Sequence, residues 1–157
     1  MQKNIVKTIT INALIVAIYC VLSLPFGQLN YGIINIRVSE IFMILCMFNK
    51  KFIPSLVIGC LLVNIFSGMP YDWIIGTFQT LLSCFALYYI KNKILSISIA
   101  SFLCGLIIGL ELHFVLSYPI YLAIGSVWLS ELIILIVGYF VFKIAVKNET
   151  IKKQMMG

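Results

Sequence analysis

The charged side chains of this chain stand between long apolar stretches, and this spacing most constrains what the chain can fold into. Six stretches carry few or no charges: residues 8–24, 38–48, 52–67, 72–90, 94–116 and 121–146. A transmembrane helix needs about 20 consecutive, mainly apolar residues. Only 10% of the residues are charged and the mean hydropathy is +1.12, values that exclude a soluble catalytic domain. We therefore expect an all-α integral membrane protein whose six transmembrane helices form a single domain over residues 1–157.

The lysines indicate how these helices are oriented. All ten lysines lie before the first stretch, between the second and third, between the fourth and fifth, or at and after the end of the sixth. In a six-helix chain these positions share one side of the membrane, and only Arg37 falls on the other side. Because cytoplasmic loops are enriched in basic residues, both termini are expected in the cytoplasm. The basic residues form no patch with interleaved aromatic residues, so nucleic acid is not an expected partner.

The second stretch and the segment before it differ from the rest. As an α-helix, residues 38–48 would rise only about 16 Å, about half of the hydrocarbon thickness. The preceding segment contains Pro25, Gly27, Asn30 and Gly32, which interrupt a helix. Non-helical backbone is tolerated at membrane depth where it is buried in protein or lines a cavity. We therefore expect an ordered outer loop over residues 25–37, with a binding site beside it.

Polar side chains recur at similar depths in the predicted helices. Counted upward from the lysines, Glu40, Gln79 and Glu131 lie roughly 15–18 Å above the inner interface. Asn64 lies roughly 20 Å above it and Glu111 roughly 27 Å. An ionisable group near the helix centre costs about 2.5–3.5 kcal/mol on an insertion scale, so several at one level favour a shared polar cavity. We expect this cavity in the outer half of the bundle.

The expected cavity has an excess of acidic groups. The acidic residues within the predicted helices are Glu40, Asp72, Glu111 and Glu131. They face one cation, Arg37, so the site suits a small ligand that carries an amine or many hydrogen-bond donors. Two local alternatives stay open. Arg37 and Glu40, three residues apart, would merely neutralise each other, and Glu111 and His113 would form a pair at the outer surface.

Regularly spaced residues indicate which helix faces pack together. A polar stripe that should face the bundle interior consists of Asp72, Gly76, Thr80 and Ser83. Ala13 and Ala17 form an AxxxA motif, and Gly105 and Gly109 form GxxxG. Both motifs allow another helix to approach closely. For the glycine pair we favour packing inside the bundle.

Several chemistries have no support in the sequence. The five cysteines lie in apolar stretches without CxxC spacing, and His113 is the single histidine, so we expect packing thiols and neither disulfides, a metal site nor a cofactor. There is no GxxxxGK[ST] motif. Any ATP-driven work of this chain therefore needs a partner.

A set of short motifs is similar to one known family. They are IRVSEIF at 36–42, FNK at 48–50, PSLVIGCLLVN at 54–64, DWIIGTFQTLL at 72–82, GLEL at 109–112, and Glu131. Over nearly its whole length the chain resembles the QueT family of queuosine-precursor transporters, which are substrate-binding (S) components of energy-coupling factor (ECF) transporters. Gln79 departs from the small residue expected at its position, which leaves the choice among 7-deazaguanine ligands open.

The resemblance implies a six-helix S component in the cell membrane of a prokaryote. Such a component is not an enzyme; it binds a vitamin-like small molecule from outside. It works with a coupling transmembrane protein and two ATPase subunits. Ala13 and Ala17 resemble the motif through which such components dock on the coupling protein.

A 7-deazaguanine, in particular the aminomethyl compound preQ1, fits the acid-rich cavity. One carboxylate can accept the paired N–H groups of a guanine-type ring, and a second can pair with the aminomethyl cation. The residues expected to bind this ligand are Arg37, Glu40, Asn64, Asp72, Gln79, Thr80, Glu111 and Glu131. Tyr31, Phe66 or Trp73 could stack on the ring.

Three other functions stay open at this point. The same scaffold could bind queuine, queuosine or another vitamin, because a fold does not determine its ligand. A small intramembrane enzyme could use an acidic residue with His113 as acid and base. A stand-alone secondary transporter is the third alternative, although the chain shows no clear inverted repeat.

Overall fold

The computed structural model describes residues 2–26 and 37–149, and every regular element in these two ranges is a helix. The α-helices are α1 (Gln2–Ser23), α2 (Ile53–Ile65), α3 (Asp72–Tyr89), α4 (Lys93–Leu116) and α5 (Ile120–Ala145). The 3-10 helices are η1 (Leu24–Phe26), η2 (Val38–Met47) and η3 (Lys50–Phe52). Most of the expected outer loop, residues 27–36, lies outside the described residues.

The six expected helical segments are all found, with two corrections. The first helix begins at Gln2 instead of residue 8, because the polar residues before the apolar stretch continue the same helix. The second segment is the 3-10 helix η2 instead of an α-helix. Its buried residues Glu40, Met43 and Cys46 recur every third position, which matches three residues per turn. At about 2.0 Å per residue, a 3-10 helix also spans more depth with the same number of residues.

The helices differ in how well they fit a membrane. Three of them are long and apolar enough to cross it by length and composition: Ile5–Ser23, Lys93–Leu116 and Ile120–Ala145. By contrast, α2 has 13 residues, η2 has 10, and the 18 residues of α3 include the polar stripe. The stripe is buried as predicted, since Asp72, Gly76, Thr80 and Ser83 all face the interior of the protein. The protein is therefore an all-α, multi-pass membrane protein that combines long and short helices.

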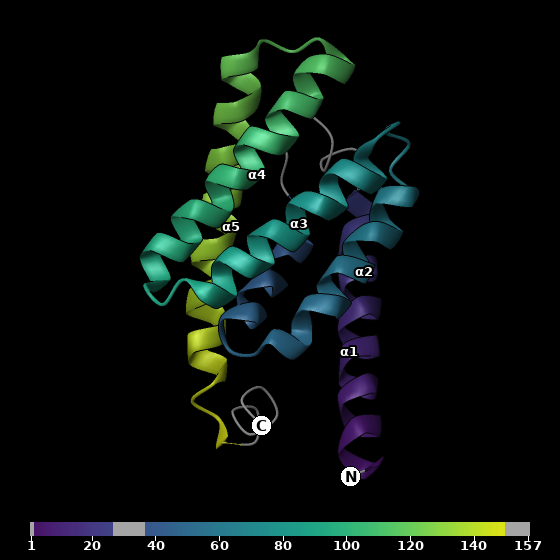
Figure 1. Cartoon of the computed structure of the whole chain (residues 1–157), viewed down its shortest axis with the longest axis vertical. Coiled ribbons are helices and arrows are strands. Elements are labelled where there is room, and N and C mark those ends of the chain that lie inside the picture. Colours follow the sequence, from purple (N-terminus) through teal and green to yellow (C-terminus); the bar gives the residue numbers. More distant parts are fainter. Residues whose placement is uncertain (1, 27–36, 150–157) are drawn as a thin grey trace.

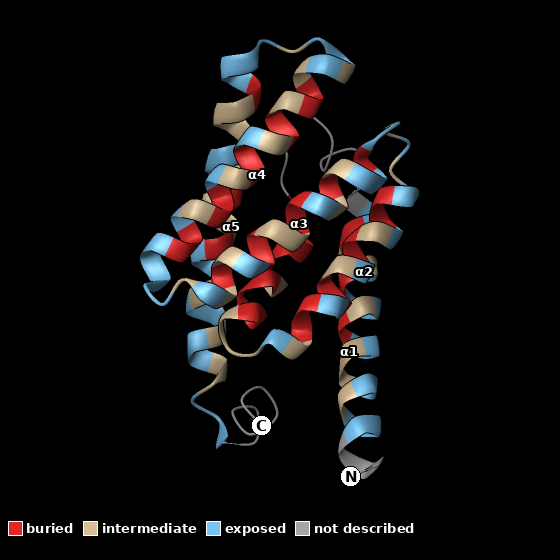
Figure 2. Ribbon diagram, viewed as in Figure 1, coloured by how far each residue is buried: buried red, intermediate tan, exposed pale blue. Residues whose placement is uncertain are grey.

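The short helix η2 lies in the middle of the bundle. It packs against α1, α3 and α5, while the pairs α1–α2, α2–α3, α3–α4 and α4–α5 pack side by side (Figure 1). The buried residues face this centre, and exposed residues cover the outward faces (Figure 2). Gly138 allows α5 to approach η2 closely, because a Cβ atom there would lie 2.9 Å from the carbonyl oxygen of Ile41.

The glycine pair on α4 packs inside the bundle, as expected. A Cβ atom on Gly105 would lie 2.5 Å from Cβ of Trp128, and one on Gly109 would lie 2.7 Å from Cα of Ile124. Both contacts are with α5. The GxxxG motif therefore joins α4 to α5.

The described lysines gather at one end of the bundle. The start of α1, η3, the α3–α4 connection and the end of α5 lie there together (Figure 1). The Ser55 hydroxyl, just after η3, donates to Oδ1 of Asn12 on α1 at 3.1 Å, so the first half of α1 lies close to the start of α2. By the rule that cytoplasmic loops are rich in basic residues, the lysine-rich end of the bundle is the end that the sequence predicts to face the cytoplasm.

Candidate substrate site: a buried polar network

Arg37 and Asp72 form the centre of a buried polar network. Arg37 is the N-cap residue of η2 and Asp72 begins α3. Arg37 Nη2 donates to both carboxylate oxygens of Asp72, at 3.1 and 3.2 Å. The distance from Arg37 Nη1 to Glu40 Oε1 is longer, 3.8 Å. Arg37 and Glu40 do form an ion pair, but the prediction that they merely neutralise each other is wrong, because Asp72 is the closer partner of the arginine.

Asn64 and Gly76 determine where Asp72 can lie. The Asn64 side-chain amide donates to the backbone carbonyl of Asp72 at 3.0 Å. A Cβ atom on Gly76 would collide with Oδ1 of Asp72 and would lie 2.6 Å from Nδ2 of Asn64. The carboxylate and the amide thus occupy the space that a side chain at position 76 would need. This packing joins α2 to α3 at the arginine.

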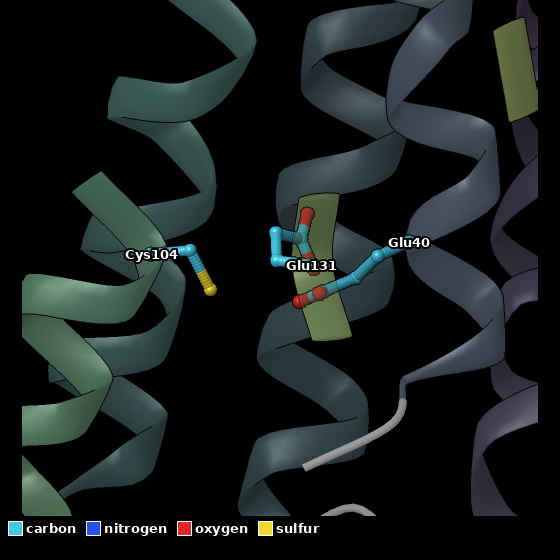
Figure 3. Close-up of side chains that lie close together, drawn as sticks. All are labelled: Glu40, Cys104 and Glu131. Atoms are coloured by element: carbon cyan, nitrogen blue, oxygen red, sulfur yellow. The ribbon is translucent and has the colours of Figure 1, made fainter. Parts of the chain in front are cut away.

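A second cluster consists of Glu40, Cys104 and Glu131, which come from η2, α4 and α5. One ligand atom from each of the three lies within 4.8 Å of the others, and all three residues are buried. The two carboxyl groups point toward each other, and the thiol points toward both (Figure 3). Within the described part of the chain, neither Glu40 Oε1 nor Glu131 Oε1 has a hydrogen-bond partner. Two adjacent carboxylates repel in a low-dielectric interior, so this pair either shares a proton or takes a cation between its oxygens.

Gln79 and Thr80 lie further along α3, and other protein groups satisfy them. Gln79 Nε2 donates to Ser83 Oγ at 2.9 Å, and Ser83 donates to the carbonyl of Ala100 on α4 at 3.2 Å. Thr80 Oγ1 donates to the sulfur of Cys60 at 3.1 Å. Thr80 therefore joins α3 to α2, and Gln79 supports Ser83, which joins α3 to α4.

Glu111 is buried, but not as the partner of His113. Glu111 is 5% exposed, and its Oε1 has no hydrogen-bond partner among the described residues, so it is a further buried acid of the bundle. His113 Nδ1 instead lies 2.7 Å from the carbonyl oxygen of Tyr118. The surface pair between Glu111 and His113 is therefore wrong for the described structure, because the imidazole is used by the α4–α5 connection.

The aromatic residues expected to stack on a ligand lie elsewhere. Phe66 is 74% exposed and Trp73 is 47% exposed, so both are at the bundle surface, while Tyr31 lies outside the described residues. Trp73 directly follows the buried Asp72, and adjacent helical residues face different directions. One aromatic side chain that is buried in the bundle is Tyr19 on α1, which is 1% exposed.

Sequence reasoning missed two cysteines of the network. Cys60 accepts hydrogen bonds from Asn64 and Thr80, and Cys104 faces the paired glutamates. All five cysteines are free, so these two are polar contacts of the network and not only packing thiols. Helical spacing could have found them, because Cys60 precedes Asn64 by four residues and Cys104 precedes Glu111 by seven.

Ala13 and Ala17 lie apart from this network. Both are exposed on α1, which packs only along one side against α2, η1 and η2. Exposed small residues leave a helix face that another helix can approach closely.

Fold and network together define a multi-pass membrane protein with an acid-rich site enclosed by its helices. Residues 9–147 match the model of the QueT transporter family. The chain is 32% identical, over 161 aligned positions, to the queuosine precursor transporter QueT of Lactococcus lactis subsp. cremoris (strain MG1363). That alignment covers 90% of this chain and 93% of the relative. No solved structure matches the chain.

The chain belongs to the QueT transporter family.

Proposed function

We propose that this protein binds a queuosine precursor of the 7-deazaguanine class, preQ1 in particular, and serves as the S component of an ECF importer. The name of the Lactococcus relative supports the ligand class. The observation that carries the choice of preQ1 is the set of buried carboxylate oxygens without hydrogen-bond partners in the described structure, on Glu40, Glu111 and Glu131. Arg37 neutralises Asp72 first, so a cationic ligand would compensate the remaining acids.

The chemistry of preQ1 matches this arrangement group by group. One carboxylate would accept the ring N–H and the exocyclic amine as a bidentate pair. A second would pair with the aminomethyl cation. Glu40 and Glu131 lie side by side, so this pair would serve one end of the ligand, and Glu111 would serve the other. Arg37, Asn64 and Gln79 are the donors that could reach the ring carbonyl, and Thr80 would support Gln79. The nitrile compound preQ0 lacks the cation and would leave one carboxylate uncompensated.

The remaining parts of the proposal concern uptake. An ECF coupling transmembrane protein and two ATPase subunits would supply the energy, and Ala13 and Ala17 would form the docking surface on α1. The substrate would enter from the outer face of the cell membrane of a prokaryote, at the end of the bundle opposite the lysines. The exposure of both alanines supports this assignment.

Ligand titration of the purified chain tests the proposal. We expect preQ1 to bind more tightly than preQ0, queuine or queuosine. Glu40→Gln and Glu131→Gln should each weaken preQ1 binding about 30-fold, since a hydrogen bond to a charged group contributes about 2 kcal/mol. Their effect on preQ0 should be smaller. Native affinity for preQ1 in both variants would remove the glutamate pair from the site, and selective binding of another compound would overturn the ligand assignment.

Two controls keep the result specific. Glu149→Gln makes the same chemical change on an exposed residue beyond the end of α5 and should leave the affinity unchanged. Titration in EDTA addresses the metal-binding geometry of Glu40, Cys104 and Glu131. We expect EDTA to leave the affinity for preQ1 unchanged. Loss of binding in EDTA, with recovery on addition of zinc, would show instead that the cluster holds a metal ion.

A further inference from the structure

A groove between α4 and α5 lies outside the polar network. It has a volume of 440 Å³ and is formed by the first turns of α4 and the last turns of α5. Its floor is apolar and includes Ile97, Leu132 and Ile136. None of the proposed substrate-binding residues lines it. Its lining includes Lys93 at the start of α4 and Lys143 near the end of α5, so the groove lies at the lysine-rich end of this helix pair.

Two lysines that line this groove both lie near the ring of one tyrosine. Lys93 Nζ lies 5.5 Å from the ring centre of Tyr139, and Lys143 Nζ lies 5.8 Å from it. All three residues line the groove. Within the described part of the chain, neither lysine forms an ion pair, because both salt bridges found there belong to Arg37. Two ammonium groups on one ring repel each other, so an anion at this position would be favoured.

The groove thus combines an apolar channel with a cationic end. Free phosphate would use only the lysines, and a neutral lipid would use only the apolar floor. An anionic phospholipid uses both, because its headgroup carries the charge and its acyl chain is apolar. Basic pockets between transmembrane helices at a cytoplasmic face are typical sites for such headgroups. A volume of 440 Å³ is in the range of small-molecule sites, about 300–1,000 Å³.

We propose that this groove is a binding site for an anionic phospholipid of the inner leaflet. The phosphate lies between Lys93 and Lys143 against Tyr139, and one acyl chain lies along Ile97 and Leu132. The lipid would cover the α4–α5 seam at the end opposite the tight contacts of the glycine pair. The site is independent of the substrate site and of the proposed ligand.

Native mass spectrometry of the full chain in detergent, titrated with phosphatidylglycerol or phosphatidylcholine of identical acyl chains, tests the proposal. We expect phosphatidylglycerol to bind more tightly. A lysine near an anionic headgroup favours binding about fivefold, so Lys93→Gln combined with Lys143→Gln should lower phosphatidylglycerol affinity about 30-fold. The affinity for phosphatidylcholine should not change. Equal affinity of the wild-type chain for the two lipids would overturn the proposal.

The matched control is the double variant Lys91→Gln with Lys147→Gln, which removes the same charge at the same end without touching the groove. It should bind phosphatidylglycerol like the wild-type chain. An equal loss in this control would show that net charge, not the groove, attracts the lipid. Ile136→Trp fills the apolar floor and should weaken both lipids; unchanged binding would exclude the groove. Loss of a dimer in the Lys93/Lys143 variant, with lipid binding intact, would assign the groove to a second copy of the chain.

Discussion

Substitution of Gly76 tests the polar network directly, because Asp72 and Asn64 occupy the space that a side chain at position 76 would need. Replacement by alanine places a Cβ atom against Oδ1 of Asp72 and 2.6 Å from Nδ2 of Asn64. Neither atom can move freely. The carboxylate is held by Arg37 at 3.1 and 3.2 Å, and the amide donates to the Asp72 carbonyl at 3.0 Å. The added methyl group must therefore displace the ion pair or shift α3 away from α2.

The expected magnitude follows from two opposing effects. Overpacking a well-packed interior costs about 1–3 kcal/mol. Replacing glycine by alanine in a helix returns up to about 1 kcal/mol. Gly76→Ala should therefore lower the free energy of unfolding by about 1–2 kcal/mol, and breaking the buried ion pair would raise the loss toward about 3–5 kcal/mol. Gly125→Ala is the matched control, because a Cβ atom there meets nothing within 4 Å and the change should be neutral or stabilising.

Equilibrium unfolding of both variants in mixed detergent micelles measures this difference. We expect Gly76→Ala to be about 1–3 kcal/mol less stable than Gly125→Ala, because the gain in helix propensity is common to both variants. Its affinity for preQ1 should also fall, because Arg37 and Asp72 would no longer hold their positions. Equal stability of the two variants would refute the packing around Gly76 and, with it, the described geometry of the arginine.

Two further predictions concern the helix surfaces. Gly109→Ala should lower the free energy of unfolding by about 1–3 kcal/mol, because the new methyl group would lie 2.7 Å from Cα of Ile124 and backbone atoms move less easily than the end of a side chain. The same unfolding assay measures this change. Stability equal to that of Gly125→Ala would contradict close α4–α5 packing. Ala13→Trp should prevent co-purification with the coupling module and leave preQ1 binding intact; loss of ligand binding would mean that this alanine supports the bundle.

Much of the fold could be predicted from the sequence. The apolar stretches locate five α-helices to within a few residues, apart from the start of α1, because apolar length and flanking charge are local properties. The stripe on α3 faces inward as expected. The 3-10 form of η2 could not be predicted, since its three-residue repeat depends on which side chains α1, α3 and α5 bury.

The site was predictable in composition but not in pairing. Every proposed substrate-binding residue is buried, as expected for polar groups held within a membrane. The partners are different from those that sequence neighbours indicate. Arg37 lies closer to Asp72, 35 residues away, than to Glu40. Phe66 and Trp73 are at the surface of the bundle because exposure depends on helix rotation, which hydrophobicity alone does not determine, and a stacking role of Tyr31 stays a prediction.

The sequence by itself determined that this chain crosses a membrane, where its lysines gather, and that its helices bury an excess of acids. These properties follow from the free-energy cost of placing a charged group in hydrocarbon, and this cost depends on the composition of each segment by itself. Only the tertiary structure decided that Glu40, Cys104 and Glu131 meet, and that two lysines share one tyrosine beside an apolar groove. Such contacts join residues that are far apart in the chain. They depend on the rotation and depth of whole helices, which close packing among all of them sets together.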